Sequence, residues 1–115
     1  MEALIQKIKE FAAERDWDQF HAPKNLAMAL SVEVAELVEI FQWLTEEESY
    51  RLDEKDRDHL QAEIGDIVIY LTALASKFDI HPLEAAHQKL RLNRQKYPAD
   101  LVRGSRNKYS RQGAP

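Results

Sequence analysis

Apolar residues recur at helical spacing along most of the chain. In the first segment, Leu4, Ile5, Ile8, Phe11 and Ala12 fall on one side of a helix. Two later segments are apolar around most of their circumference, which is typical of helices buried on several sides. The pattern predicts four long helices, at about residues 2–15, 24–44, 56–78 and 83–96. Nothing indicates a set of alternating strands, so we expect an all-α fold, a bundle of four to five helices.

The segments between these helices contain helix-start signals. Pro23 and Pro82 stand where the first turn of a helix tolerates proline best. Thr45 followed by Glu48 matches a capping box, which predicts a short helix inside the polar connector. The last segment, residues 103–115, is polar and basic, which is typical of a C-terminal tail outside the folded domain. We therefore expect one helical domain over residues 1–102, followed by this tail.

Composition narrows the functional class. With 115 residues the chain fits one domain, and its 44% hydrophobic content permits a core. A net charge of -4 argues against nucleic acid as a partner. Cysteine is absent, which excludes disulfides and thiolate chemistry. No stretch approaches the roughly 18 uncharged apolar residues of a membrane span. We expect a soluble cytoplasmic protein with no membrane partner.

The two most apolar helices each carry a pair of carboxylates. Glu33 and Glu36 stand three residues apart on the second helix, and Glu63 and Asp66 repeat the spacing on the third. This spacing places each pair on one helix face. Buried acids repel and raise one another's pKa unless a positive charge compensates them. Lys and Arg are absent from residues 25–50 and 58–76, so we expect a divalent cation such as Mg²⁺, which typically bridges carboxylates to substrate phosphates. The alternative is that these acids face solvent.

Two neighbouring residues extend this pattern. Glu39 continues the acidic stripe and ranks below the other four as a ligand. Gly65 stands inside the third helix, where glycine costs about 1 kcal/mol relative to alanine. It either permits a close helix approach beside the metal or marks a local deviation of the helix.

Several stretches together resemble a known family. They are "FAAERDWDQFH", "EVAELVEIFQW", "AEIGDIVIYLTALA" and "NRQKYP". With the ExxE and ExxD pairs separated by 26 residues, the chain resembles the MazG-like all-α nucleoside triphosphate pyrophosphohydrolases, specifically the dCTP pyrophosphatase branch. The resemblance covers about residues 4–110.

The resemblance implies an activity, a cofactor and an assembly. The activity is cleavage of a dNTP, dCTP or a modified dCTP first, to dNMP and pyrophosphate, in sanitation of the nucleotide pool. Glu33, Glu36, Glu63 and Asp66 match the family's Mg²⁺ ligands, with Mn²⁺ as a substitute. Either Glu36 or Glu63 takes the proton of the attacking water, and the choice stays open. The implied assembly is a homotetramer, a dimer of dimers, whose bundle cores are built across subunits.

The resemblance also assigns substrate contacts. The residues on the base side are Trp17, His21, Trp43 and Tyr70. Those on the phosphate side are Lys89 and Asn93, with Arg94 and Lys96 ranked lower. Helix-spaced aromatics more often serve packing, and basic residues near a helix C-terminus are favoured by the helix dipole in any case.

Three rival interpretations remain. The same chemistry on dUTP or another non-canonical NTP stays within the family. A ferritin-like di-iron bundle needs two ExxH motifs on two helices; Glu84 and His87 supply one, and Asp56 with His59 only approximates the other. A non-catalytic oligomeric helical module would use the apolar helices for assembly and the acids for solubility.

Overall fold

The computed structural model describes residues 1–104, without the side chain of Val102. Its elements are α1 (Glu2–Glu14), η1 (Asp18–Phe20), α2 (Pro23–Phe41), η2 (Glu48–Tyr50), α3 (Glu54–Ser76), α4 (Pro82–Lys96) and α5 (Ala99–Val102). No strand occurs among these described residues, which confirms the all-α prediction. The chain divides into two units, Met1–His81 and the part from Pro82 onward, and each is described by itself. Of the predicted tail, residues 105–115 lie outside the described part.

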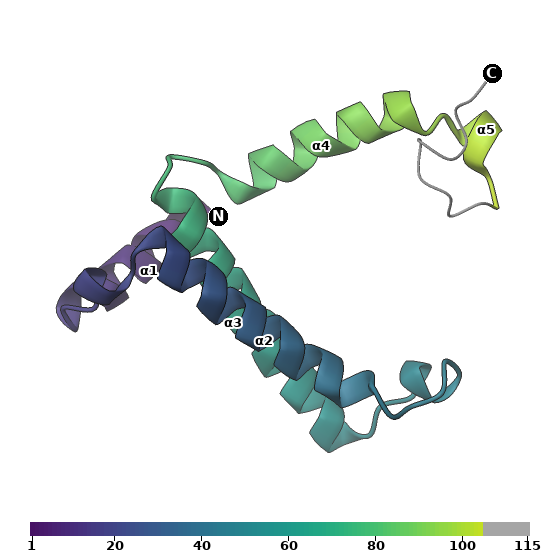
Figure 1. Ribbon diagram of the computed structural model, residues 1–115, viewed down its shortest axis with the longest axis horizontal. Coiled ribbons are helices and arrows are strands. Elements are labelled where there is room, and N and C mark those ends of the chain that lie inside the picture. Colours follow the sequence, from purple (N-terminus) through teal and green to yellow (C-terminus); the bar gives the residue numbers. More distant parts are fainter. Residues whose placement is uncertain (105–115) are drawn as a thin grey trace. The chain divides into compact units, whose positions relative to one another are not determined.

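The first unit is built on an antiparallel pair of helices. α2 and α3 pack along each other, joined by the connector that contains η2, and α1 packs against α3 (Figure 1). Pro23 is the first residue of α2, as the sequence predicts, because its missing N–H would have no partner there. This arrangement sets the acidic stretch of α2 opposite that of α3.

Side-chain caps determine where the connector folds and where α3 begins. The backbone N–H of Thr45 donates to Glu48 Oε1 at 2.9 Å, and the N–H of Glu48 donates to Thr45 Oγ1 at 3.1 Å. This reciprocal pair confirms the predicted capping box. The carboxylate of Asp53 accepts a hydrogen bond from the N–H of Asp56 at 2.7 Å and caps α3. The helix therefore begins at Glu54, two residues before the expected start.

The apolar core of the described part is small. Its buried apolar residues are Ala12, Leu26 and Ala73, one from each of the helices α1, α2 and α3. They lie where these three helices meet, since all three line one cavity described below. Large apolar side chains of α2 and α3 stay exposed, among them Val32, Val38 and Ile64. The predicted core built across subunits remains a prediction, because the structure holds one copy of the chain.

Gly65 fits neither of the two reasons suggested by the sequence. A Cβ atom built at Gly65 would meet no atom within 4 Å, so no element among the described residues approaches it closely. α3 also runs without a break from Glu54 to Ser76. The described residues include no helix that is both long and apolar enough to cross a lipid bilayer.

Candidate functional site

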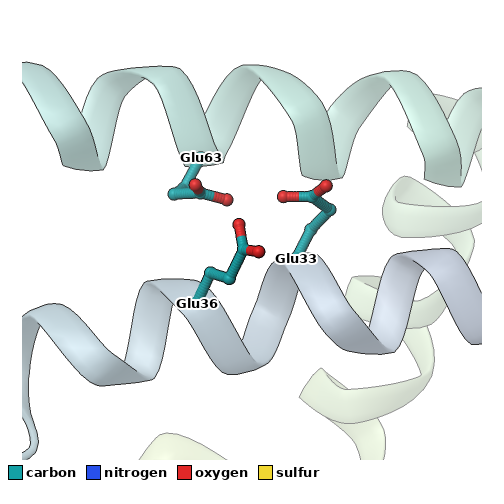
Figure 2. Close-up of side chains that lie close together, drawn as sticks. All are labelled: Glu33, Glu36 and Glu63. Atoms are coloured by element: carbon teal, nitrogen blue, oxygen red, sulfur yellow. The ribbon is translucent and has the colours of Figure 1, made fainter.

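Three of the four predicted carboxylate ligands converge between α2 and α3. Glu33 and Glu36 project from α2 toward Glu63 on α3, and their carboxyl groups face one another in the space between the helices (Figure 2). One oxygen from each of the three lies within 4.8 Å of the others. Glu63 is the most enclosed of them, with 6% of its surface exposed. The acids therefore point into the molecule and not at bulk solvent.

Two oxygens of this cluster have no partner. Glu33 Oε2 and Glu63 Oε2 are both buried and accept no hydrogen bond. A proton on Glu33 can be donated to Glu63; this hydrogen bond, then burial and the charges of Glu36 and Glu63, raises the pKa of Glu33 to about 7. The cluster thus requires a positive charge, which a shared proton supplies only in part.

The donor set fits a hard divalent cation. Carboxylate oxygens are the ligands that Mg²⁺ prefers, and a few carboxylates leave room for waters and for substrate phosphate. Two buried oxygens without a hydrogen-bond partner are what such a site contains before the ion binds. In this structure Glu33, Glu36 and Glu63 would hold the cation.

Asp66 lies outside this cluster. It follows Glu63 by one helical turn on α3, is exposed, and lines a cavity of about 240 Å³ between α1, α2 and α3. The cavity is lined by Ile8, Phe11, Ala12, Trp17, His21, Leu26, Asp66, Ile69, Tyr70 and Ala73. Its lining is mostly apolar, which suits a ring system. Because Asp66 lines the cavity and follows Glu63 by one helical turn, a ligand in the cavity and a cation on the cluster would be neighbours.

Trp17, His21 and Tyr70, three of the predicted base contacts, share this cavity. The ring of Trp17 meets that of His21 edge-on at a centroid distance of 6.4 Å. The ring of Trp17 also meets that of Phe11 edge-on, at a centroid distance of 5.5 Å. Aromatic walls with polar N–H and O–H groups can pack on a planar base and hydrogen-bond its edge.

The end of α1 determines where Trp17 lies. Asp16 adopts φ 53°, the left-handed conformation, directly after the helix. The N–H of Trp17 then donates to the carbonyl of Ala12 at 2.9 Å, and that of Asp16 to Ala13 at 3.1 Å. These two bonds form a Schellman motif, which ends the helix and reverses the chain. Because the chain reverses here, the side chain of Trp17 lies in the wall of the cavity.

Trp43, the fourth predicted base contact, does not reach the cavity. α2 ends at Phe41, three residues before the expected end, so Trp43 is not two turns along the same helix from Glu36. Its ring is 87% exposed and does not line the cavity. Its role as a base contact remains a prediction.

The predicted phosphate contacts all lie on α4, in the second unit. They are Lys89, Asn93, Arg94 and Lys96. Asn93 is partly buried, and the three cations are exposed. Their assignment to the triphosphate remains a prediction.

Sequence reasoning missed one residue beside the cluster. His59, on α3, places Nε2 3.5 Å from Glu63 Oε1. The spacing of four residues was the available signal, because side chains at i and i+4 of a helix are neighbours. Ile8 and Phe11 were expected on the apolar face of the first helix, but their place in the cavity depends on how α1 packs on α3.

Comparison with known proteins agrees with this geometry. The model of the MazG-like family matches residues 28–111, which include both acidic pairs. The chain belongs to the MazG-like family. The predicted family resemblance is thus confirmed.

Two kinds of relative extend the comparison. The dCTP pyrophosphatase 1 proteins of Mus musculus and of Homo sapiens are each 48% identical over 103 residues, 88% of this chain. This MazG-like chain spans 61% of the length of these curated relatives. A pyrophosphatase of Archaeoglobus fulgidus with a known crystal structure is 42% identical, with a TM-score of 0.80, covering 85% of this chain and 92% of that one.

Proposed function

We propose that this MazG-like chain is a nucleoside triphosphate pyrophosphohydrolase that depends on a divalent cation, with Mg²⁺ as the ion and Mn²⁺ as a substitute. Its substrate is dCTP or a modified cytosine nucleotide, and its products are dNMP and pyrophosphate. Its role would be sanitation of the nucleotide pool in the cytoplasm. The observation that carries the proposal is the convergence of Glu33, Glu36 and Glu63 with two buried oxygens that lack partners.

The reaction class follows from the chemistry of such a cluster. When bound, Mg²⁺ supplies neutralisation of the triphosphate charge and activation of a water. The water oxygen attacks the α-phosphorus, and the bond between that phosphorus and the bridging α–β oxygen breaks. The leaving group is pyrophosphate. Glu36 or Glu63 accepts the proton of the water, because both carboxylates face the same small space.

The base would bind in the cavity beside the cluster. Trp17, His21 and Tyr70 would provide the ring contacts, and Asp66 lines the same cavity one helical turn after Glu63. Asp66 is proposed as the fourth ligand of the cation, which it would reach by a side-chain rotation on a continuous helix. The preference for cytosine is supported by the dCTP pyrophosphatase 1 relatives.

The test is pyrophosphate release from a nucleotide panel. The purified 115-residue chain with Mg²⁺ should cleave dCTP or a modified dCTP fastest among the common dNTPs, dUTP and modified nucleotides. EDTA should abolish the release, and Mn²⁺ should restore it. If no nucleotide yields pyrophosphate, the proposal is wrong and a non-catalytic module is favoured.

A pair of matched variants connects this activity to the cluster. Glu36→Gln removes one ligand charge at nearly constant volume and should lower kcat/KM by about 100-fold or more, as losses of electrostatic groups in active sites do. Glu46→Gln makes the same chemical change on an exposed carboxylate of the connector and should leave the rate unchanged. Equal activity of the two variants would remove the cluster from the mechanism.

A further inference from the structure

His59 stands at the solvent side of the cluster. It lies one turn before Glu63 on α3, and its side chain is 54% exposed, whereas that of Glu63 is 8% exposed. Its Nε2 is 3.5 Å from Glu63 Oε1. Neither composition nor the family resemblance assigned it a part in the site.

The two oxygens of Glu63 have different surroundings. Oε1 is in contact with His59, whereas Oε2 is buried and accepts no hydrogen bond. Without a cation, Glu63 is repelled by the charge of Glu36, and also by that of Glu33 once Glu33 loses its proton above about pH 7. Rotation of the Glu63 side chain toward solvent would relieve that repulsion. An imidazole on Oε1 opposes this rotation, since the contact would be lost when the carboxylate turns away.

We propose that His59 is a positioning residue that holds the Glu63 carboxylate in place for the cation. The inference rests on the proposed function, since it takes the acidic cluster to be the cation site. Partners that orient a ligating carboxylate raise metal affinity because less freedom is lost when the ion binds. His59 itself does not have to touch the ion or the nucleotide.

Direct cation binding tests this role without activity as the readout. Mn²⁺ is titrated into the 115-residue chain without nucleotide, and the free ion is measured by electron paramagnetic resonance. His59→Ala should weaken Mn²⁺ binding about tenfold, the lower end of the effects known for such outer partners. His59→Gln, whose amide N–H reaches a similar point, should keep most of the wild-type affinity.

A matched control comes from the same helix. Lys55→Ala also removes a basic, exposed side chain from α3 one turn earlier, and should leave Mn²⁺ binding unchanged. Alanine is a better helix former than histidine, so His59→Ala should keep the fold, which a thermal melt checks. With saturating Mg²⁺, the KM for dCTP should be the same in His59→Ala as in the wild type.

Three outcomes would overturn the inference. Unchanged Mn²⁺ affinity in His59→Ala would show that the contact does nothing for the cation. If His59→Ala lost far more affinity for Ni²⁺ than for Mn²⁺, His59 would be a ligand of the ion, because imidazole suits Ni²⁺ better than Mn²⁺. If wild-type protein and Glu36→Gln bind Mn²⁺ equally weakly, the proposed function fails together with this inference. Tight wild-type binding with an unaffected His59→Ala overturns the inference alone.

Discussion

At the residue scale, Glu33 connects the cation site to stability. The hydrogen bond with Glu63, together with burial and neighbouring charge, raises its pKa from 4.5 to about 7. Below about pH 4.5 the residue is protonated in the folded and unfolded chain alike. Between pH 4.5 and about 7 only the folded chain keeps the proton on Glu33, so the free energy of unfolding falls as the pH rises. Above about pH 7 Glu33 is ionised in both states, and the free energy of unfolding falls no further on its account.

We therefore expect the metal-free protein to become less stable as the pH rises from about 4.5 to 7. Glu33→Gln should flatten this part of the profile and raise the melting temperature at pH 7.5, because the amide has no charge to bury. Melting curves in EDTA across this range measure both effects. Mg²⁺ should stabilise the wild type more than the variant, since ligand binding to the folded state adds stability. A variant with the wild-type pH profile would contradict this account.

How far the sequence predicts the site depends on the residue. The convergence of Glu33, Glu36 and Glu63 was predictable, since helical spacing and the lack of nearby Lys and Arg both indicate it. The place of Asp66 in a cavity wall was not, because the cavity depends on how α1 packs against α3. The expected place of Trp43 on the second helix was wrong, because α2 ends at Phe41, while its role as a base contact stays a prediction.

At the element scale, helix centres were predictable and helix ends were not. The apolar period identified all four long helices to within three residues at each end. α1 and α3 end in Schellman motifs whose left-handed residue is Asp16 in one and Asp79 in the other. Glycine is the usual residue at this position, so the sequence indicated these two ends only by the break in the apolar period, which placed them within two residues.

The interior of α3 offers a test of its surroundings. Gly65→Ala should raise the free energy of unfolding by about 1 kcal/mol, because alanine forms helix better and the new Cβ meets no atom within 4 Å. Urea unfolding measures the change. Ala62→Gly, at another exposed position of the same helix, should lower stability by a similar amount. A destabilised Gly65→Ala would mean that a second copy of the chain packs on this face.

At the scale of the whole molecule, exposed apolar residues are the main feature. On α2, Met28 is 58%, Val32 54% and Val38 51% exposed, and on α3 Ile64 is 48% exposed. Only three apolar side chains are buried in the described part of the chain. Large apolar side chains exposed on two packed helices indicate an interface, since covering them removes apolar area from water.

The predicted homotetramer, a dimer of dimers, would cover this surface. The 115-residue chain should sediment well above the mass of a single copy at micromolar concentration. Val38→Glu places a charge on the exposed side of α2 and should shift the distribution toward smaller species, because burying an unpaired carboxylate is costly. Lys24→Glu, at an exposed polar position of the same helix, should leave the distribution unchanged. Monomeric wild-type protein at this concentration would refute the assembly, while dissociation by Val38→Glu with lost pyrophosphatase activity would show that the site needs its neighbours.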